Sequence, residues 1–324
     1  MAGSKTVVLA ALFANGAIAV LKFGGFLLTQ SPAMLSETYH SISDTGNQVF
    51  LLIGLRYGGK DPTRSHPFGY GKAQFFYSFL VSVMLFGIAG WESAKHGFEA
   101  LTGHGRVLSR QASLLGYQFP GVWVNYSVLL GGIAFESYAF AKAYAEMKRQ
   151  IDRHGWSGFR EAFSRTSDTT TLTALTEDTV ALLGLVFALV GIFLTEQTGD
   201  HVYDAGAALL IGFLLMGFAV ALAWENKRLL LGESLPKADE KELRRVIAEW
   251  PEVSEVVDFR TVYFGPNDVV VTADVAFRSE LDTASMDEAI SALEDALREA
   301  NPALSKVYVE PETGVDRGER GTAD

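Results

Sequence analysis

Six apolar stretches, each long enough to cross a lipid bilayer, constrain the fold of this chain more than any other feature. They lie at residues 7–28, 33–56, 75–101, 123–146, 172–194 and 204–226. A bilayer core of about 30 Å needs roughly 20 apolar residues in helical conformation. Since backbone polar groups cannot stay unpaired in hydrocarbon, each stretch is predicted to be a helix. We therefore expect an α-helical membrane protein with six transmembrane helices in residues 1–231.

The basic residues of the short loops predict the orientation of these helices. They gather in the second loop and the fourth, while the first and fifth loops have none and the third has Arg106 and Arg110. Because cytoplasmic loops carry the excess of Lys and Arg, both termini are predicted to be cytoplasmic. The basic residues of the second and fourth loops are Arg56, Lys60, Arg64, Lys72, Lys148, Arg149, Arg153, Arg160 and Arg165.

After Leu231 the pattern becomes that of a soluble domain. Leu243, Val246 and Ile247 give a helix its apolar face, and two β-branched runs follow across a Gly-Pro-Asn turn. A second helical pattern and a last strand complete the order helix, strand, strand, helix, strand. We expect a small α+β domain over residues 232–312 and a disordered, Gly-rich tail over 313–324.

Composition excludes several functions. The net charge is −11 and no dense basic patch is present, which argues against binding of nucleic acid. The chain has no cysteine, so disulfides, thiolate metal sites and thiol catalysis are all excluded. A bound metal would be held by imidazole, oxygen or Met thioether ligands.

Ionisable residues inside the apolar stretches are the candidates for function, because each is costly in a bilayer unless it is paired or hydrated. The simpler interpretation for Lys22, Glu92 and Glu136 is an interhelical salt bridge. The full set is Lys22, Glu37, His40, Asp44, Glu92, Glu136, Glu177 and Asp178.

The second stretch carries the strongest signal. His40 and Asp44 are four residues apart, so they point to one side of a helix, and Asn47 lies near the same face. This arrangement is half of a metal site or of a proton relay. The alternative is a pair at a helix end near the membrane surface.

The fifth stretch supplies adjacent carboxylates, Glu177 and Asp178. Neighbouring residues point about 100° apart on a helix, so only one can face a given site directly. At least one must face inward, either toward a metal or toward a basic partner such as Lys22. His40, Asp44 and a carboxylate from this helix would form a divalent-cation site. Imidazole suits Zn, Co, Fe or Ni, and oxygen ligands extend the range to Mn. Protons compete for such ligands, which is the chemical basis of antiport.

These features together resemble the cation diffusion facilitator family. The matching motifs are "HSISD", "HPFGYGK", an Asp in the fifth helix, "DAGAALLIG", "LLGESLP" and the α+β tail, in that order and to about Glu310. The resemblance implies a homodimer that exchanges divalent metal for protons, with a ferredoxin-like cytoplasmic domain. It also implies a membrane site with two ligands from the second helix, His40 and Asp44, and two from the fifth.

One ligand position departs from the family pattern. The fifth helix commonly has a His four residues before its Asp, but here Asp178 follows Ala174. In this the chain is similar to the branch that includes the mitochondrial zinc transporter of animals. Glu177, Asn47 or water are the candidates to replace the missing ligand.

Two auxiliary metal sites of the family are weakened. The loop site, built in some members from an Asp and two His, has only His66 here, with Thr63 and Tyr70 at the other positions. The sequence has no His after His201, so an imidazole-rich site in the tail domain is excluded. The tail is predicted to be mainly a dimerisation module. Lys72 and Glu233 are predicted to pair.

We expect an exporter of Zn²⁺ in the inner membrane of a bacterium, coupled to protons, with metal ligands among His40, Asp44, Asp178, Glu177 and Asn47. An exporter of Mn²⁺, Fe²⁺ or Co²⁺ is an alternative, and a membrane metal sensor or scaffold without transport is another. An enzyme is not expected, since no paired nucleophile and base and no HExxH motif is present. No cofactor is expected besides the transported metal.

Overall fold

The computed structural model describes residues 2–104, 111–114, 117–155, 157–159, 162 and 169–312. The chain divides into two compact units. The first contains Met1–Leu52 and Leu80–Ala223, and the second contains Ile53–Phe79 and Trp224–Asp324. The predicted disordered tail, residues 313–324, lies outside the described residues.

All six predicted apolar stretches are helical. They lie in α1 (Ala2–Thr29), α2 (Pro32–Gly58), the run from α3 (Lys72–Met84) through η1 (Leu85–Gly90) to α4 (Trp91–Leu101), α5 (Gly121–His154), α7 (Thr169–Thr198) and α8 (Val202–Leu231). The segment η1 is π-helical, which the sequence analysis did not predict. Such segments inside α-helices are frequent at functional sites.

These helices differ in how apolar they are along their length. In the described part of the chain, three helical runs are long and apolar enough to cross a bilayer: Lys72–Leu101, Leu175–Thr198 and Val202–Leu231. Large apolar side chains also point outward, including Phe13 (77% exposed) and Val20 (71%) on α1. An outward apolar surface of this kind suits contact with lipid.

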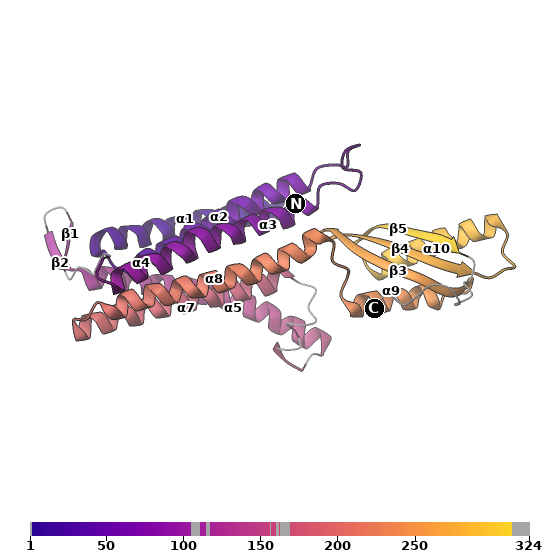
Figure 1. The fold of residues 1–324 in the computed structure, drawn as a ribbon. Helices are drawn as coiled ribbons and strands as arrows, with labels where there is room; N and C mark the ends of the chain where they lie inside the picture. Colours follow the sequence, from indigo (N-terminus) through magenta and orange to yellow (C-terminus); the bar gives the residue numbers. More distant parts are fainter. Residues whose placement is uncertain are drawn as a thin grey trace. The chain divides into compact units, whose positions relative to one another are not determined.

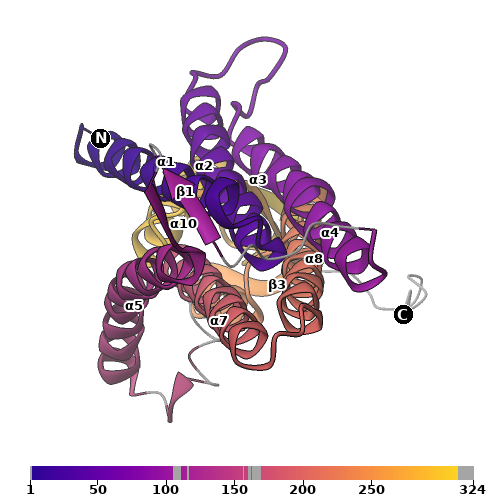
Figure 2. The ribbon, with the colours of Figure 1, turned by 90° about the vertical axis from the view of Figure 1, so that its left-hand side faces the viewer.

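Within the first unit the helices run side by side (Figures 1 and 2) around an apolar core. Phe26 of α1, Met34 of α2, Leu129 of α5, Leu185 of α7 and Ile211 of α8 all belong to this core. It packs α2 and α7, which carry the candidate site residues, together with α1, α5 and α8. Between α4 and α5, strands β1 (Gln111–Leu114) and β2 (Tyr117–Pro120) pair antiparallel, a feature the sequence did not signal.

The tail domain has the predicted element order: α9 (Lys237–Ala248), β3 (Val253–Gly265), β4 (Asp268–Phe277), α10 (Thr283–Ala300) and β5 (Leu304–Glu312). Strand β4 is central, antiparallel to β3 and parallel to β5. Leu243 and Ile247 of α9 and Leu293 and Leu297 of α10 are buried in one core with the sheet, as the apolar pattern of α9 predicted.

The loop between α2 and α3 belongs to the second unit and contacts the β3–β4 turn. The rings of Phe68 and Phe264 lie 4.8 Å apart between centroids, and Lys72 Nζ lies 4.8 Å from the Phe264 centroid. The predicted pair of Lys72 with Glu233 is wrong, because Glu233 pairs with Arg228 instead. The aromatic ring of Phe264 offers Lys72 a cation–π contact in its place.

The three loop positions discussed above do come together. Thr63 and His66 form a backbone bridge, the rings of His66 and Tyr70 stack 4.3 Å apart, and Thr63 Oγ1 lies 3.0 Å from the Tyr70 hydroxyl. Hydroxyl and aromatic groups fill the positions where other family members carry ligands. These contacts support a structural role for the loop.

Candidate metal centre

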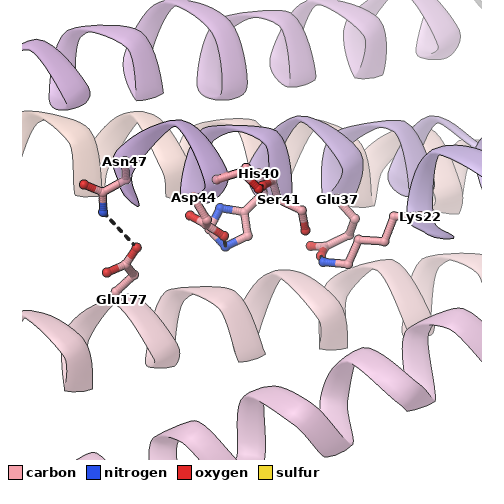
Figure 3. A network of polar contacts seen from close by, with 8 residues as sticks. Lys22, Glu37, His40, Ser41, Asp44, Asn47 and Glu177 are labelled. Atoms are coloured by element: carbon pink, nitrogen blue, oxygen red, sulfur yellow. Dashed lines mark hydrogen bonds and ion pairs between the residues drawn. The ribbon is translucent and has the colours of Figure 1, made fainter. Parts of the chain in front are cut away.

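The candidate site is built on one face of α2. The helix begins at Pro32, and the Oγ atom of Ser31 accepts a hydrogen bond from Met34 N at 3.1 Å, which caps its first turn. From there Glu37, His40, Asp44 and Asn47 recur at intervals of three and four residues, so they share a face. We call this row of four residues the polar track (Figure 3).

His40 and Asp44 lie together, as predicted. The distance from His40 Nε2 to Asp44 Oδ2 is 3.6 Å, and the two side chains are 3% and 17% exposed. Among the described residues, neither ring nitrogen of His40 has a hydrogen-bond partner. His40 is more than two turns into α2, so the alternative of a helix-end pair does not fit. A buried imidazole without partners is available to bind a cation.

The opposite wall of the track comes from α7. Asn47 Nδ2 donates a hydrogen bond to Glu177 Oε1 at 3.3 Å across the two helices (Figure 3). Glu177 therefore faces α2 rather than a salt-bridge partner, which answers a question the sequence left open. The Glu177 carboxylate and the Asn47 amide thus offer further oxygen atoms about one turn along α2 from Asp44.

Asp178 is less closely engaged. It lies within electrostatic range of Asp44 and of Glu136 on α5, and its side chain is half-buried. Among the described residues, no three His, Asp or Glu side chains are close enough together to hold a metal ion. The structure thus brings the five predicted residues to one region as two contacting pairs and a nearby carboxylate, without a closed coordination shell.

Glu37 of the polar track forms a buried ion pair that the sequence did not predict for this residue. Lys22 of α1 pairs with Glu37 of α2, with 2.8 Å between Nζ and Oε2, and the side chains are only 2% and 0% exposed. The interhelical salt bridge predicted for Lys22 is confirmed, but its partner is Glu37 and not a carboxylate of α7. The spacing of Glu37 and His40 on one helical face was the signal available for Glu37.

Glu92 and Glu136, the remaining carboxylates of the apolar stretches, do not form the predicted interhelical salt bridges among the described residues. Glu92 pairs with Lys95 and His96 on its own helix, at 3.6 and 3.7 Å, so the predicted interhelical bridge is wrong. The spacings of three and four residues make these local pairs possible. None of the ion pairs between described residues includes Glu136, which instead lies within electrostatic range of Lys22.

Comparison with known proteins identifies the family to which the chain belongs. The family described as "Cation efflux transmembrane domain" matches residues 8–231, and "Cation efflux protein, cytoplasmic domain" matches residues 235–313. A human relative named "Proton-coupled zinc antiporter SLC30A9, mitochondrial" is 30% identical over 283 residues, which cover 87% of this chain and 48% of the relative. The chain thus spans about half the length of that relative.

Two further relatives have similar coverage of this chain. "Metal tolerance protein C4" of Arabidopsis thaliana is 24% identical over 278 residues, covering 86% of this chain and 58% of the relative. "Putative transporter MamV" of Paramagnetospirillum magneticum is 24% identical over 260 residues, covering 77% and 66%. A solved MamM CTD structure in a nickel form covers 25% of this chain at a TM-score of 0.23.

The family comprises transporters and not enzymes, and a metal carried by such a protein is its substrate and not a cofactor. The match covers most of the chain and includes every residue of the polar track. This chain is an integral membrane protein of the cation efflux family.

Proposed function

We propose that the protein exports a divalent transition-metal ion, Zn²⁺ first among them, from the cytoplasm in exchange for protons. The observation that carries the proposal is the buried His40 imidazole beside Asp44, on a face of α2 that is opposite the Glu177 carboxylate of α7. Among the described residues, the ring nitrogens of His40 have no hydrogen-bond partner. A relative named as a proton-coupled zinc antiporter supports the choice of substrate.

The chemistry of the ligands links metal to protons. Imidazole nitrogen and carboxylate oxygen bind Zn²⁺ only when they are deprotonated, so metal arrival releases protons and protonation releases metal. In the proposed cycle His40, Asp44 and Asp178 bind the ion, and Glu177 and Asn47 provide the oxygen that replaces the missing fifth-helix His. Closure of α2 on α7 would complete the coordination shell of the metal, because the His40–Asp44 and Asn47–Glu177 pairs already lie in one region.

The wider organisation is also a proposal. Six membrane crossings, cytoplasmic termini and a location in a bacterial inner membrane are supported by the six long helices and the distribution of basic loop residues. A ferredoxin-like tail domain that joins two protomers is supported by the α-β-β-α-β order and the match to a cytoplasmic domain of the family. The proposed domains are residues 1–231 and 232–312.

Uptake into proteoliposomes with an imposed pH gradient tests the function. Zn²⁺, Mn²⁺, Fe²⁺, Co²⁺ and Cd²⁺ are compared for the wild type and for Asp178→Ala, with Glu196→Gln as control because Glu196 is an exposed carboxylate on the same helix. We expect gradient-dependent Zn²⁺ uptake that only Asp178→Ala loses. Preference for Mn²⁺ or Fe²⁺ would revise the substrate, and no flux of any metal would favour a sensor.

A further inference from the structure

The Lys22–Glu37 pair is the most completely buried charged contact among the described residues of the first unit. Lys22 is 2% exposed and Glu37 is 0% exposed. Neither is among the proposed metal ligands. Burial of two opposite charges is costly and is weak evidence for a purely stabilising role.

Small residues on neighbouring helices make room for the pair. An added Cβ at Gly184 of α7 would lie 2.6 Å from Glu37 Oε1, and one at Gly132 of α5 would lie 3.9 Å from Lys22 Cε. The pair therefore sits where α1, α2, α5 and α7 meet. Glu37 Oε1 has no hydrogen-bond partner among the described residues, so Lys22 is its principal neutralising group.

Solvent accessibility changes along the polar track, between His40 and Asp44. Every residue of α2 from Pro32 to Thr38 is buried, whereas the residues from Asp44 to Gln48 are partly exposed. The track is therefore open toward the end of α2 that carries Asn47 and closed toward the start of the helix. Lys22 and Glu37 lie within the closed part, next to the buried His40 (Figure 3).

The charge of Lys22 acts on any cation that reaches His40. An ion moving from His40 toward the start of α2 would next meet Glu37, whose charge is already neutralised by the ammonium group. Repulsion between two cations is strong in a medium of low dielectric constant. Without Lys22, Glu37 would be an unpaired carboxylate about one turn beyond His40 and would attract the ion.

We propose that Lys22, held by Glu37, is a positioning residue that ends the metal pathway at His40 in this conformation. The inference rests on the proposed transport function and adds to it a barrier on the side of the track toward the start of α2. On the proposed orientation this is the non-cytoplasmic side. Movement of the pair away from α7 would then be required before metal leaves.

The test uses two readouts on the full-length protein. Lys22→Met with Glu37→Gln removes both charges with similar volumes and leaves no orphan charge. The matched variant Lys22→Arg keeps the cation. The first readout is Zn²⁺ flux in proteoliposomes without a pH gradient, and equilibrium Zn²⁺ binding checks that the double variant keeps its site.

The second readout does not need flux. The chain has no cysteine, so Ser41→Cys introduces a single thiol at a buried position of α2, next to His40 in the sequence. A charged, membrane-impermeant thiol reagent is applied from the side of the start of α2. We expect the reagent to label the introduced thiol about tenfold faster in the double variant than in the protein that keeps Lys22 and Glu37. This is the change in rate for a modest lowering of the barrier to entry.

The outcomes separate the two claims. Leak of Zn²⁺ and faster labelling in the double variant, with neither in Lys22→Arg, would support the barrier. The barrier is overturned if a double variant that still binds Zn²⁺ shows unchanged labelling and unchanged Zn²⁺ flux without a pH gradient. The pair would then have only a structural role. If the wild type shows no flux, the proposed function fails, while the labelling rates still decide the role of Lys22.

Discussion

At the scale of single residues, the account depends on His40 and Asp44 as ligands that hold either metal or protons. Replacing Asp44 by Ala removes a proposed ligand from a partly exposed position beside His40, whose ring nitrogens have no hydrogen-bond partner among the described residues. We expect Zn²⁺ affinity to fall by at least about 100-fold, because loss of an outer group that only orients a ligand already costs about 10- to 100-fold. Equilibrium binding measures this, and a folded, dimeric variant with unchanged affinity would contradict the assignment.

Asn47 and Glu177 are predicted to contribute differently to Zn²⁺ affinity. Asn47→Ala removes a hydrogen-bond donor to Glu177, so we expect a loss of Zn²⁺ affinity of about tenfold, as for outer groups that orient a ligand. Glu177→Gln removes a charged ligand and is expected to cost more. Titration of both variants under identical conditions checks the order, and a larger loss for Asn47→Ala would make the amide oxygen the replacement ligand.

At the scale of elements, Gly184 lies where α7 passes closest to the buried Glu37 carboxylate of α2. A Cβ at position 184 would lie 2.6 Å from Glu37 Oε1, so Gly184→Ala is expected to separate α7 from α2 or break the Lys22 pair, lowering thermal stability and transport. Gly131→Ala on α5 is the control, because nothing lies within 4 Å of its added Cβ. Equal thermal stability of the two variants would contradict the packing.

The first turn of α10 in the tail domain has a pH-dependent cap. Asp282 Oδ1 accepts a hydrogen bond from Ser285 N at 2.8 Å, and this bond lowers the pKa of Asp282 below its usual value. A lowered pKa in the folded state gives stability that is present above the unfolded pKa of about 3.9 and is lost as pH falls through the folded pKa. Hydrogen exchange of this turn in the full-length protein should rise on acidification more than in Asp282→Asn, which caps without titrating. Identical pH profiles would contradict the role of the charge.

At the scale of the whole molecule, the account allows tight metal binding only in the membrane region. The tail domain has no His, and in the loop His66 lies against the hydroxyl-bearing Thr63 and Tyr70, with no second imidazole. The full-length variant with both Asp44→Ala and Asp178→Ala is therefore expected to bind no Zn²⁺ at submicromolar concentration while remaining a dimer in size-exclusion chromatography. Submicromolar binding in that variant would reveal a second site.

Periodicity predicted much of this molecule from the sequence, because it acts within one element. The six long helices, the element order of the tail and the shared face of His40, Asp44 and Asn47 all follow from spacing along a single helix or strand. The partners of Lys22 and Lys72 did not follow, since they depend on which helix or turn packs opposite. The π-helical segment and the β1–β2 pair also lacked a local signal.

The central claim is that metal and protons exchange on the same ligands, and simultaneous recording of Zn²⁺ entry and proton exit in one population of vesicles tests it most directly. Wild type is compared with Asp44→Asn, which keeps the shape of the side chain but neither ionises nor binds metal as a carboxylate. The account predicts opposite fluxes in fixed ratio in the wild type, both lost in the variant. Zn²⁺ entry without proton movement, or coupled exchange that persists in Asp44→Asn, would contradict it.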